Sequence, residues 1–330
     1  AFLKSFEEGQ ELLRLTEEKL KEEDPKRGDI LRIPVVFHIL HNNGLENISD
    51  QQVLDAFYIL NRDFRKRNAD TADVVDQFKS IIGDIEVEFS LASKAPDGTE
   101  FNGITRTMSE ETSSGDGQNQ VEAIATGNDV YQGLWPGDEY LNVFIMSQVI
   151  PGASGYTYNP FDWGFGQSMG NGIYMTHSYV GSIGTGTLNR SRVLSHEAGH
   201  WLNLSHTWGP NNDPGNAASC GSDDGVSDTP NTIGTTSCLL NQNDCGPVSN
   251  VENYMDYSFC NKMFTEGQKS RMRAALSSSV GGRDNLITTT NLEKTGSDFL
   301  LSANFSASKL SLCNTGQVQF YDKSYNFRLC

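Results

Sequence analysis

The sequence predicts an α+β protein in which a mixed β-sheet with helices precedes an irregular, cysteine-rich region. Three observations predict this architecture. Strand-like apolar runs and helical patterns alternate over the first half of the chain, a glycine-rich segment follows, and all six cysteines lie after residue 219. With 330 residues, the chain has room for one large domain and an appendage.

The N-terminal segment predicts a helix. Over residues 5–24, apolar residues recur at helical spacing among many charges, and Pro25 and Gly28 end the pattern. We expect a surface helix in a separate segment, residues 1–28, that is either a propeptide remnant or an extension of the mature protein.

Strands and one long helix are predicted next. Ser49 and Asp50 are placed to begin the helix, which continues to residue 67. Asp97 and Gly98 predict a turn between strand-like runs. The predicted strands cover residues 30–40, 85–93 and 140–147.

Residues 150–188 are rich in glycine, tyrosine, serine and asparagine, with one strand candidate at residues 172–177. A helix is predicted over residues 192–203, with Asn189 or Ser191 as its N-cap.

The last predicted helix begins near Thr265, which forms a capping box with Gln268. Beyond it, residues 286–299 have the composition of a linker, and residues 300–330 alternate like β-strands. This tail is too short for a core of its own, so we expect either added strands or the start of a further domain.

Charge and cysteine use restrict the partners and the compartment. A formal net charge of −17 argues against nucleic acid or an anionic membrane as a partner. No apolar run approaches the roughly 20 residues that a membrane span needs, and the first residues lack the apolar core of a signal peptide. We expect any signal peptide to have been removed already. No cysteine pair has CxxC spacing, so disulfides and a secreted protein are predicted.

The run "HEAGHWLNLSH" holds three of the six histidines in eleven residues. On a helix, His196 and His200 point to one side, while Glu197 is offset by about 100° and can reach a water molecule there. His206 can join them only if the helix stops, and Asn203 tolerates the left-handed backbone that stops it. Three imidazoles with an open fourth position are typical of a catalytic zinc site.

The alternative for this run is a core helix with fortuitous histidines. HExxH should arise by chance in well under ~1% of chains of this size, and the third histidine makes chance rarer still. We therefore predict one catalytic zinc ion. The remaining histidines, His38, His41 and His177, lie near strand ends and are predicted to be structural.

The motif HExxHxxxxxH resembles the zinc motif of metzincin metalloproteases, and Met255 in "VENYMDYSFC" is suitably placed for their methionine turn. The strings "IPVVFHIL", "GVSDTP" and "MFTEGQKSRM" are similar to the pappalysin family, over roughly residues 30–283. The resemblance implies a metzincin-type zincin catalytic domain over residues 29–285. It would have a twisted mixed sheet and helices above the cleft and an irregular, disulfide-stapled lower subdomain. One departure is Asn203, where the family usually has glycine.

The resemblance also implies further site features. Four clustered cysteines allow three pairings, and the family's crossed pattern implies Cys220–Cys245 and Cys238–Cys260, with Cys313 and Cys330 left over. Tyr257 would hydrogen-bond the tetrahedral intermediate, or else only pack. Arginine-cleaving relatives have an extra acidic residue near here, and only Asp256 is present, so strict arginine specificity is not expected.

The acidic loop over residues 220–230 is by composition as compatible with a simple turn as with a cation site. Related pappalysins bind calcium in this loop, which implies one or more structural calcium ions here. The implied ligands are Asp224 and Thr229 with main-chain oxygens of Val226 and Ser227, and Asp223 and Asp228 as further carboxylates.

Together these features predict a secreted zinc endopeptidase with Glu197 as general base. A protein or peptide substrate would bind extended, as an added strand on an exposed edge at residues 172–177. Two alternatives remain: a catalytically silent zinc- and calcium-binding adhesive or structural module, and a zinc hydrolase of non-peptide bonds. The tail resembles the start of a polycystic-kidney-disease-type β-sandwich, which secreted bacterial proteases often carry.

Overall fold

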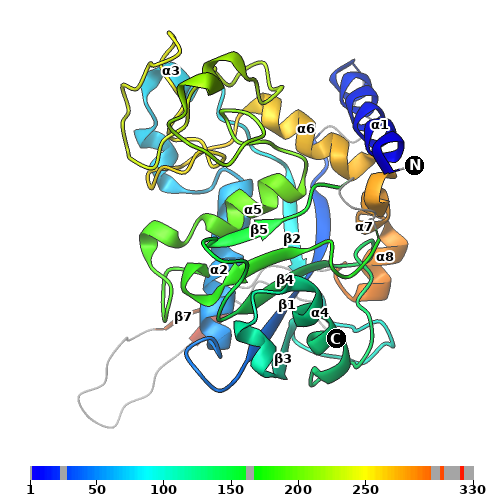
Figure 1. Cartoon of the computed structure of the whole chain (residues 1–330). Helices are drawn as coiled ribbons and strands as arrows, with labels where there is room; N and C mark the ends of the chain where they lie inside the picture. The colour runs from blue at the N-terminus through cyan, green and yellow to red at the C-terminus, as the bar shows by residue number, and fades with distance from the viewer. Residues whose placement is uncertain (1, 23–27, 161–166, 299–304, 308–319, 323–330) are drawn as a thin grey trace, which may run out of the picture.

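The structure is a computed structural model that describes residues 2–22, 28–160, 167–298, 305–307 and 320–322. Its centre is a six-stranded sheet in the order β2-β1-β4-β6-β5, with β3 also paired to β1 (Figure 1). Only β5 runs antiparallel. The strands are β1 Leu31–His41, β2 Val87–Leu91, β3 Ile104–Met108, β4 Leu141–Met146, β5 Gly155–Thr157 and β6 Ile173–Thr176.

The central strand β1 sorts its side chains between two cores because successive residues of a strand point to opposite faces. Val35 and Phe37 face the core shared with helices α2 and α5, whereas Val36 and Leu40 face the core beside α4. Both faces of the sheet are thus buried, which is typical of a sheet with parallel strands. The α-helices are α1 Phe2–Glu22, α2 Asp50–Phe64, α3 Asp76–Lys79, α4 Gly117–Gly127, α5 Val193–Trp201, α6 Glu266–Ser277, α7 Arg283–Leu286 and α8 Thr289–Thr295.

Two predicted helix starts are confirmed and one is wrong. Ser49 caps α2 by accepting a hydrogen bond from the Gln52 amide, and Thr265 with Gln268 forms the capping box of α6. The N-cap position of α5 is instead Arg192. Asn189 and Ser191 lie in or directly after a 3-10 turn, Leu188–Arg190, and the Ser191 hydroxyl donates to the Leu188 carbonyl. That turn therefore uses the Ser191 hydroxyl, which the sequence suggested as a cap.

The predicted edge strand is also wrong. The segment at residues 172–177 does form a strand, β6, but it lies between β4 and β5. The edge next to β6 is β5, which has only three residues and therefore shows no recognisable alternation in the sequence.

The cysteine-rich region, residues 207–264, is fully described and contains one short 3-10 helix, Ala217–Gly221, without longer helices or strands. Its loops lie above α5 in Figure 1. The structure contains the two disulfides that the resemblance implies, Cys220–Cys245 and Cys238–Cys260. Such links stabilise irregular chain mainly by restricting its unfolded state.

The N-terminal helix α1 lies beside α6 (Figure 1). Leu13 is buried, and Glu17 pairs with Arg271 of α6 at 3.2 Å. The origin of α1 as a propeptide remnant stays a prediction.

Near the other end of the chain, β7 Phe305–Ala307 and β8 Phe320–Asp322 pair antiparallel, while Cys313 and Cys330 fall outside the described residues. None of the helices described has the length and hydropathy that a bilayer crossing requires.

Candidate active site

The nine-residue helix α5 carries the first two histidines one turn apart. It stops where the Leu204 amide donates to the Gly199 carbonyl at 2.9 Å and Asn203 adopts a φ of 75°. Asn203 thus has the left-handed backbone that its residue type predicts. The chain then turns back, and His206 returns to the same point as His196 and His200.

The three imidazoles meet through their Nε2 atoms. The Nε2 of His200 lies 3.0 Å from that of His196 and 3.1 Å from that of His206. Each Nδ1 instead faces a main-chain carbonyl, at 2.7 Å for His196, 2.8 Å for His200 and 3.0 Å for His206. A carbonyl oxygen can only accept, so each Nδ1 carries the proton and each Nε2 presents a lone pair.

The electrostatics favour these neutral imidazoles. Burial, with the neighbouring His200, lowers the pKa of His196 to about 3, and burial lowers that of His200 to about 4. Burial and the other two histidines lower the pKa of His206 well below its usual range. Three lone pairs that face one another repel unless a cation lies between them, and within the described residues this is the only such group of three ligand side chains.

Glu197 is only 6% exposed. It lies beside the three histidines, and all four side chains line a hollow of about 260 Å³. Burial raises the pKa of its carboxyl to about 8. A Cβ on Gly155 would lie 2.8 Å from the Met175 sulfur, 3.0 Å from the Tyr174 carbonyl and 3.2 Å from the Glu197 Cγ. Gly155 therefore lets β5 lie close to both β6 and Glu197.

Met255 packs against α5 at Gly199, and Tyr257 lies beside the histidines. Met255 is fully buried, and its carbonyl accepts a hydrogen bond from the Thr207 amide at 3.3 Å. Tyr257 is 40% exposed, and its ring centre lies 5.4 Å from that of His196 and 4.8 Å from that of His206. Burial, with the Glu197 charge, raises the pKa of Tyr257 to about 12. Its phenol therefore stays protonated and able to donate.

Several residues of this site were not predicted from the sequence. The carbonyls that orient the histidines belong to Tyr254, Leu204 and Asn211. Trp208 stacks on His206, with ring centres 4.3 Å apart. Main-chain carbonyls carry no residue signature, so no sequence pattern could have identified the first three. Further residues of the hollow are Tyr156, Thr157, Asn159, Ser205, Pro210 and Asn212.

The three carboxylates of the acidic loop, residues 220–230, have different hydrogen-bond partners. Asp224 is buried and accepts from the Thr229 hydroxyl at 2.7 Å and from the Val226 amide at 3.0 Å. Asp223 instead accepts from the Gly225 amide, while Asp228 accepts from Thr265 and Gly267 at the start of α6. Ser227 is exposed. Of the six implied calcium ligands, only Asp224, Val226 and Thr229 are in mutual contact.

The other three histidines have structural contacts. His38 is fully buried between the Thr105 hydroxyl at 2.8 Å and the Asn142 side-chain oxygen at 3.0 Å. His41 accepts from the Asn43 amide, and His177 contacts the Thr185 hydroxyl. These contacts agree with the structural role expected of all three.

The fold and the histidine cluster are those of a metzincin metalloprotease. The chain belongs to the peptidase M43 family, described as pregnancy-associated plasma protein-A, whose profile matches residues 125–277. Extracellular metalloprotease 1 of Coccidioides posadasii is 28% identical over 254 residues, which cover 73% of this chain and 75% of that protein. An extracellular metalloprotease of Colletotrichum graminicola is 27% identical over 257 residues, with coverage of 73% and 75%.

Solved structures agree with this assignment. Mature mirolysin of Tannerella forsythia, in complex with a cleaved peptide, is 32% identical with a TM-score of 0.68, covering 81% of this chain and 98% of that chain. A promirolysin variant is 28% identical with a TM-score of 0.67, covering 85% and 97%. The chain is thus a secreted, zinc-dependent metalloendopeptidase.

Proposed function

We propose that His196, His200 and His206 hold the catalytic zinc and that Glu197 is the general base. The observation that carries this proposal is the meeting of three unprotonated Nε2 atoms within 4.8 Å of one another. Zinc with Zn–N bonds of about 2.0–2.1 Å in tetrahedral geometry needs ligand nitrogens about 3.3 Å apart. The separations of 3.0 and 3.1 Å fit this requirement.

Zinc, when bound, supplies a Lewis acid that lowers the pKa of a water molecule and polarises the scissile carbonyl. The Glu197 carboxylate takes a proton from the attacking water and passes it to the leaving amine. The Tyr257 phenol donates a hydrogen bond to the oxyanion that develops on the scissile carbonyl. The fully buried Met255 side chain packs against Gly199 of α5.

The substrate is proposed to bind extended along β5, the edge strand that lines the hollow through Gly155, Tyr156 and Thr157. Mature mirolysin has been captured with a cleaved peptide, which supports a peptide substrate for this chain. Apart from Glu197 and the histidines, the described residues of the hollow are uncharged. Asp256 is buried and accepts from Thr207, Thr235 and Ser258. These features support cleavage without strict selection for arginine.

A structural calcium ion is proposed for the loop at Asp224. The support is the convergence of a buried carboxylate, the Val226 carbonyl and the Thr229 hydroxyl, which are hard oxygen ligands. Asp228 is assigned instead to the start of α6, where its carboxylate accepts two hydrogen bonds.

The test of the zinc site combines metal content with cleavage of an unstructured protein such as casein. Wild type should hold one zinc per chain and cleave casein until a zinc-selective chelator is added. Glu197→Gln should keep its zinc and lose hydrolysis by at least about 10²-fold. Full activity of that variant would contradict the mechanism, and wild type that holds zinc without cleaving casein would indicate a latent zymogen or a very narrow substrate.

A further inference from the structure

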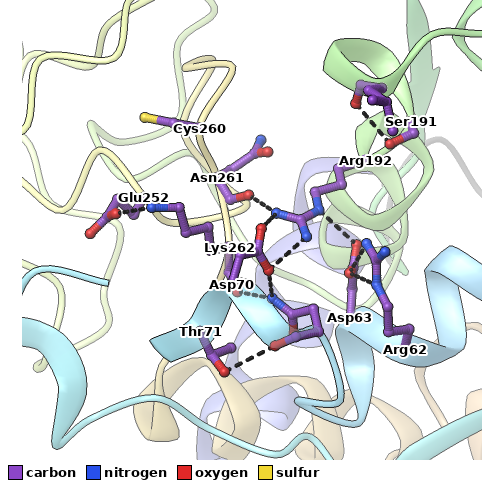
Figure 2. Close-up of polar contacts among 12 residues, drawn as sticks. Arg62, Asp63, Asp70, Thr71, Ser191, Arg192, Glu252, Cys260, Asn261 and Lys262 are labelled. Atoms are coloured by element: carbon purple, nitrogen blue, oxygen red, sulfur yellow. Dashed lines mark hydrogen bonds and ion pairs between the residues drawn. The ribbon is translucent and has the colours of Figure 1, made fainter. Parts of the chain in front are cut away.

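A cluster of polar contacts joins three segments of the chain near the first zinc-binding histidine, His196 (Figure 2). The first is the end of α2 with the 3-10 helix Ala69–Asp73 that follows it. The second is the start of α5. The third is residues 252–262, here named the methionine-turn segment, which carries Met255 and Tyr257.

Arg192, at the start of α5, contacts both of the other segments. Its guanidinium donates a hydrogen bond to Asp70 at 3.0 Å and forms an ion pair with the same carboxylate at 2.8 Å. It lies 3.6 Å from Asp63. It also donates to the main-chain carbonyl of Asn261. Figure 2 shows the side chain extending from α5 towards Asp70 and Asn261. Only a planar, forked donor group reaches three acceptors in this way.

The position of Arg192 connects it with the first histidine. Arg192 lies four residues before His196, at the N-cap position of α5, and its main-chain carbonyl accepts the His196 amide at 3.1 Å. Its guanidinium lies 5.6 Å from the ring centre of Tyr254, and the Tyr254 carbonyl accepts the Nδ1 proton of His196 at 2.7 Å. Arg192 therefore contacts residues on both sides of Met255 and Tyr257 in the methionine-turn segment.

The charges in this cluster argue against a ligand site. A hollow of about 480 Å³ lies here, lined in part by Arg62, Arg192 and Lys262. Each of these cations has a carboxylate partner: Asp63 for Arg62, Asp63 and Asp70 for Arg192, and Glu252 for Lys262. No surplus positive charge remains to attract an anion. The contacts instead connect segments of chain.

We propose that Arg192 is a positioning residue that holds the methionine-turn segment against α5 and thereby fixes the orientation of His196. This inference rests on the proposed zinc site. A hydrogen-bond partner of a metal-binding histidine contributes to metal affinity because it fixes the ring and its tautomer. Loss of Arg192 frees the Tyr254 carbonyl to move away from His196, so the zinc site loosens while the fold persists.

The experiment compares Arg192→Met with Arg62→Met in the full chain. Arg62 is the matched control because it also forms an ion pair with Asp63, but the described contacts give it no bond to the methionine-turn segment. Three quantities are measured: the rate of zinc loss to a chromogenic chelator, the visible absorption spectrum of the cobalt-substituted protein, and kcat and KM on a peptide. The free energy of unfolding is measured alongside.

Arg192→Met should lose zinc about tenfold faster, alter the cobalt spectrum and lower kcat more than KM. Arg62→Met should leave all three unchanged, even where its stability falls as far. Arg192→Lys, which keeps the charge without the fork, should fall between wild type and Arg192→Met, and it provides the test if Arg192→Met does not fold. Equal zinc loss and equal cobalt spectra in the Arg192 and Arg62 variants would overturn the positioning role. Wild type that holds no zinc would overturn the zinc site itself, and this is seen before any variant is compared.

Discussion

The Met255 side chain lies directly against Gly199, so that a Cβ on residue 199 would overlap the methionine sulfur. Gly199 stands between Glu197 and His200 on α5 and accepts the Leu204 amide that ends the helix. The contact with Met255 therefore restricts position 199, which directly precedes the second histidine, to a residue without a side chain.

Gly199→Ala should consequently destabilise the protein by about 1–3 kcal/mol, because the buried sulfur has to shift. Zinc should also leave faster, since the added methyl group pushes α5 and Met255 apart. Gly221→Ala is the control, because open space surrounds that position. Urea unfolding and zinc-loss rates check this, and equal stability of the two variants would show that the contact with Met255 is unimportant.

Asn203 holds the turn that returns His206 to the site. Asn203→Gly should keep the zinc, because glycine adopts a φ of 75° without strain. Asn203→Val should cost about 1–3 kcal/mol and speed zinc loss, because a β-branched residue resists this backbone. Asn43 has a φ of 60° far from the histidines in sequence, so Asn43→Val should be strained but retain zinc normally. Zinc loss from Asn203→Val at the wild-type rate would contradict the role of the turn.

His38 makes stability depend on pH. Burial lowers its pKa from 6.5 to about 4, so between these values the unfolded chain binds a proton that the native protein does not. Stability is therefore complete above about pH 6.5 and declines as the pH falls towards 4, by at most about 1.4 kcal/mol per unit. The difference between wild type and His38→Gln isolates this effect, since the other histidines titrate in both. A difference in the free energy of unfolding between the two proteins that stays constant from pH 7 to 4.5 would exclude this contribution of His38.

Because β5 lies at an edge of the sheet, we can predict how a substrate peptide pairs with it. A peptide that pairs with it uses every second amide for main-chain hydrogen bonds. N-methylation along a cleaved peptide should therefore raise KM strongly at alternate positions and weakly between them. Kinetics on a set of singly methylated peptides measures this. A uniform effect would argue against strand addition.

The acidic loop gives a prediction about calcium. Calcium at 100 times its Kd should stabilise the protein by about 2.7 kcal/mol, seen as a higher Tm than in EGTA. Asp224→Asn should abolish this shift, whereas Asp223→Asn should preserve it, because Asp223 faces the Gly225 amide instead. An undiminished shift in Asp224→Asn would place the ion elsewhere.

The sequence by itself determined the features that depend on neighbouring residues. The spacing of His196 and His200, the left-handed turn at Asn203 and the capping box at Thr265 all arise within a few residues. Helical periodicity and side-chain chemistry specify such features locally. The disulfide pairing followed from the family resemblance, because four cysteines alone leave it open.

Only the tertiary structure decided which distant segments complete the site. The contacts of Arg192 could not be predicted, because its partners Asp70 and Asn261 lie far away in sequence. The edge strand was misassigned because pairing order depends on the whole sheet. The Tyr254 and Asn211 carbonyls that orient the histidines are main-chain atoms, which every residue has. Their role depends on long-range packing, and no local pattern encodes it.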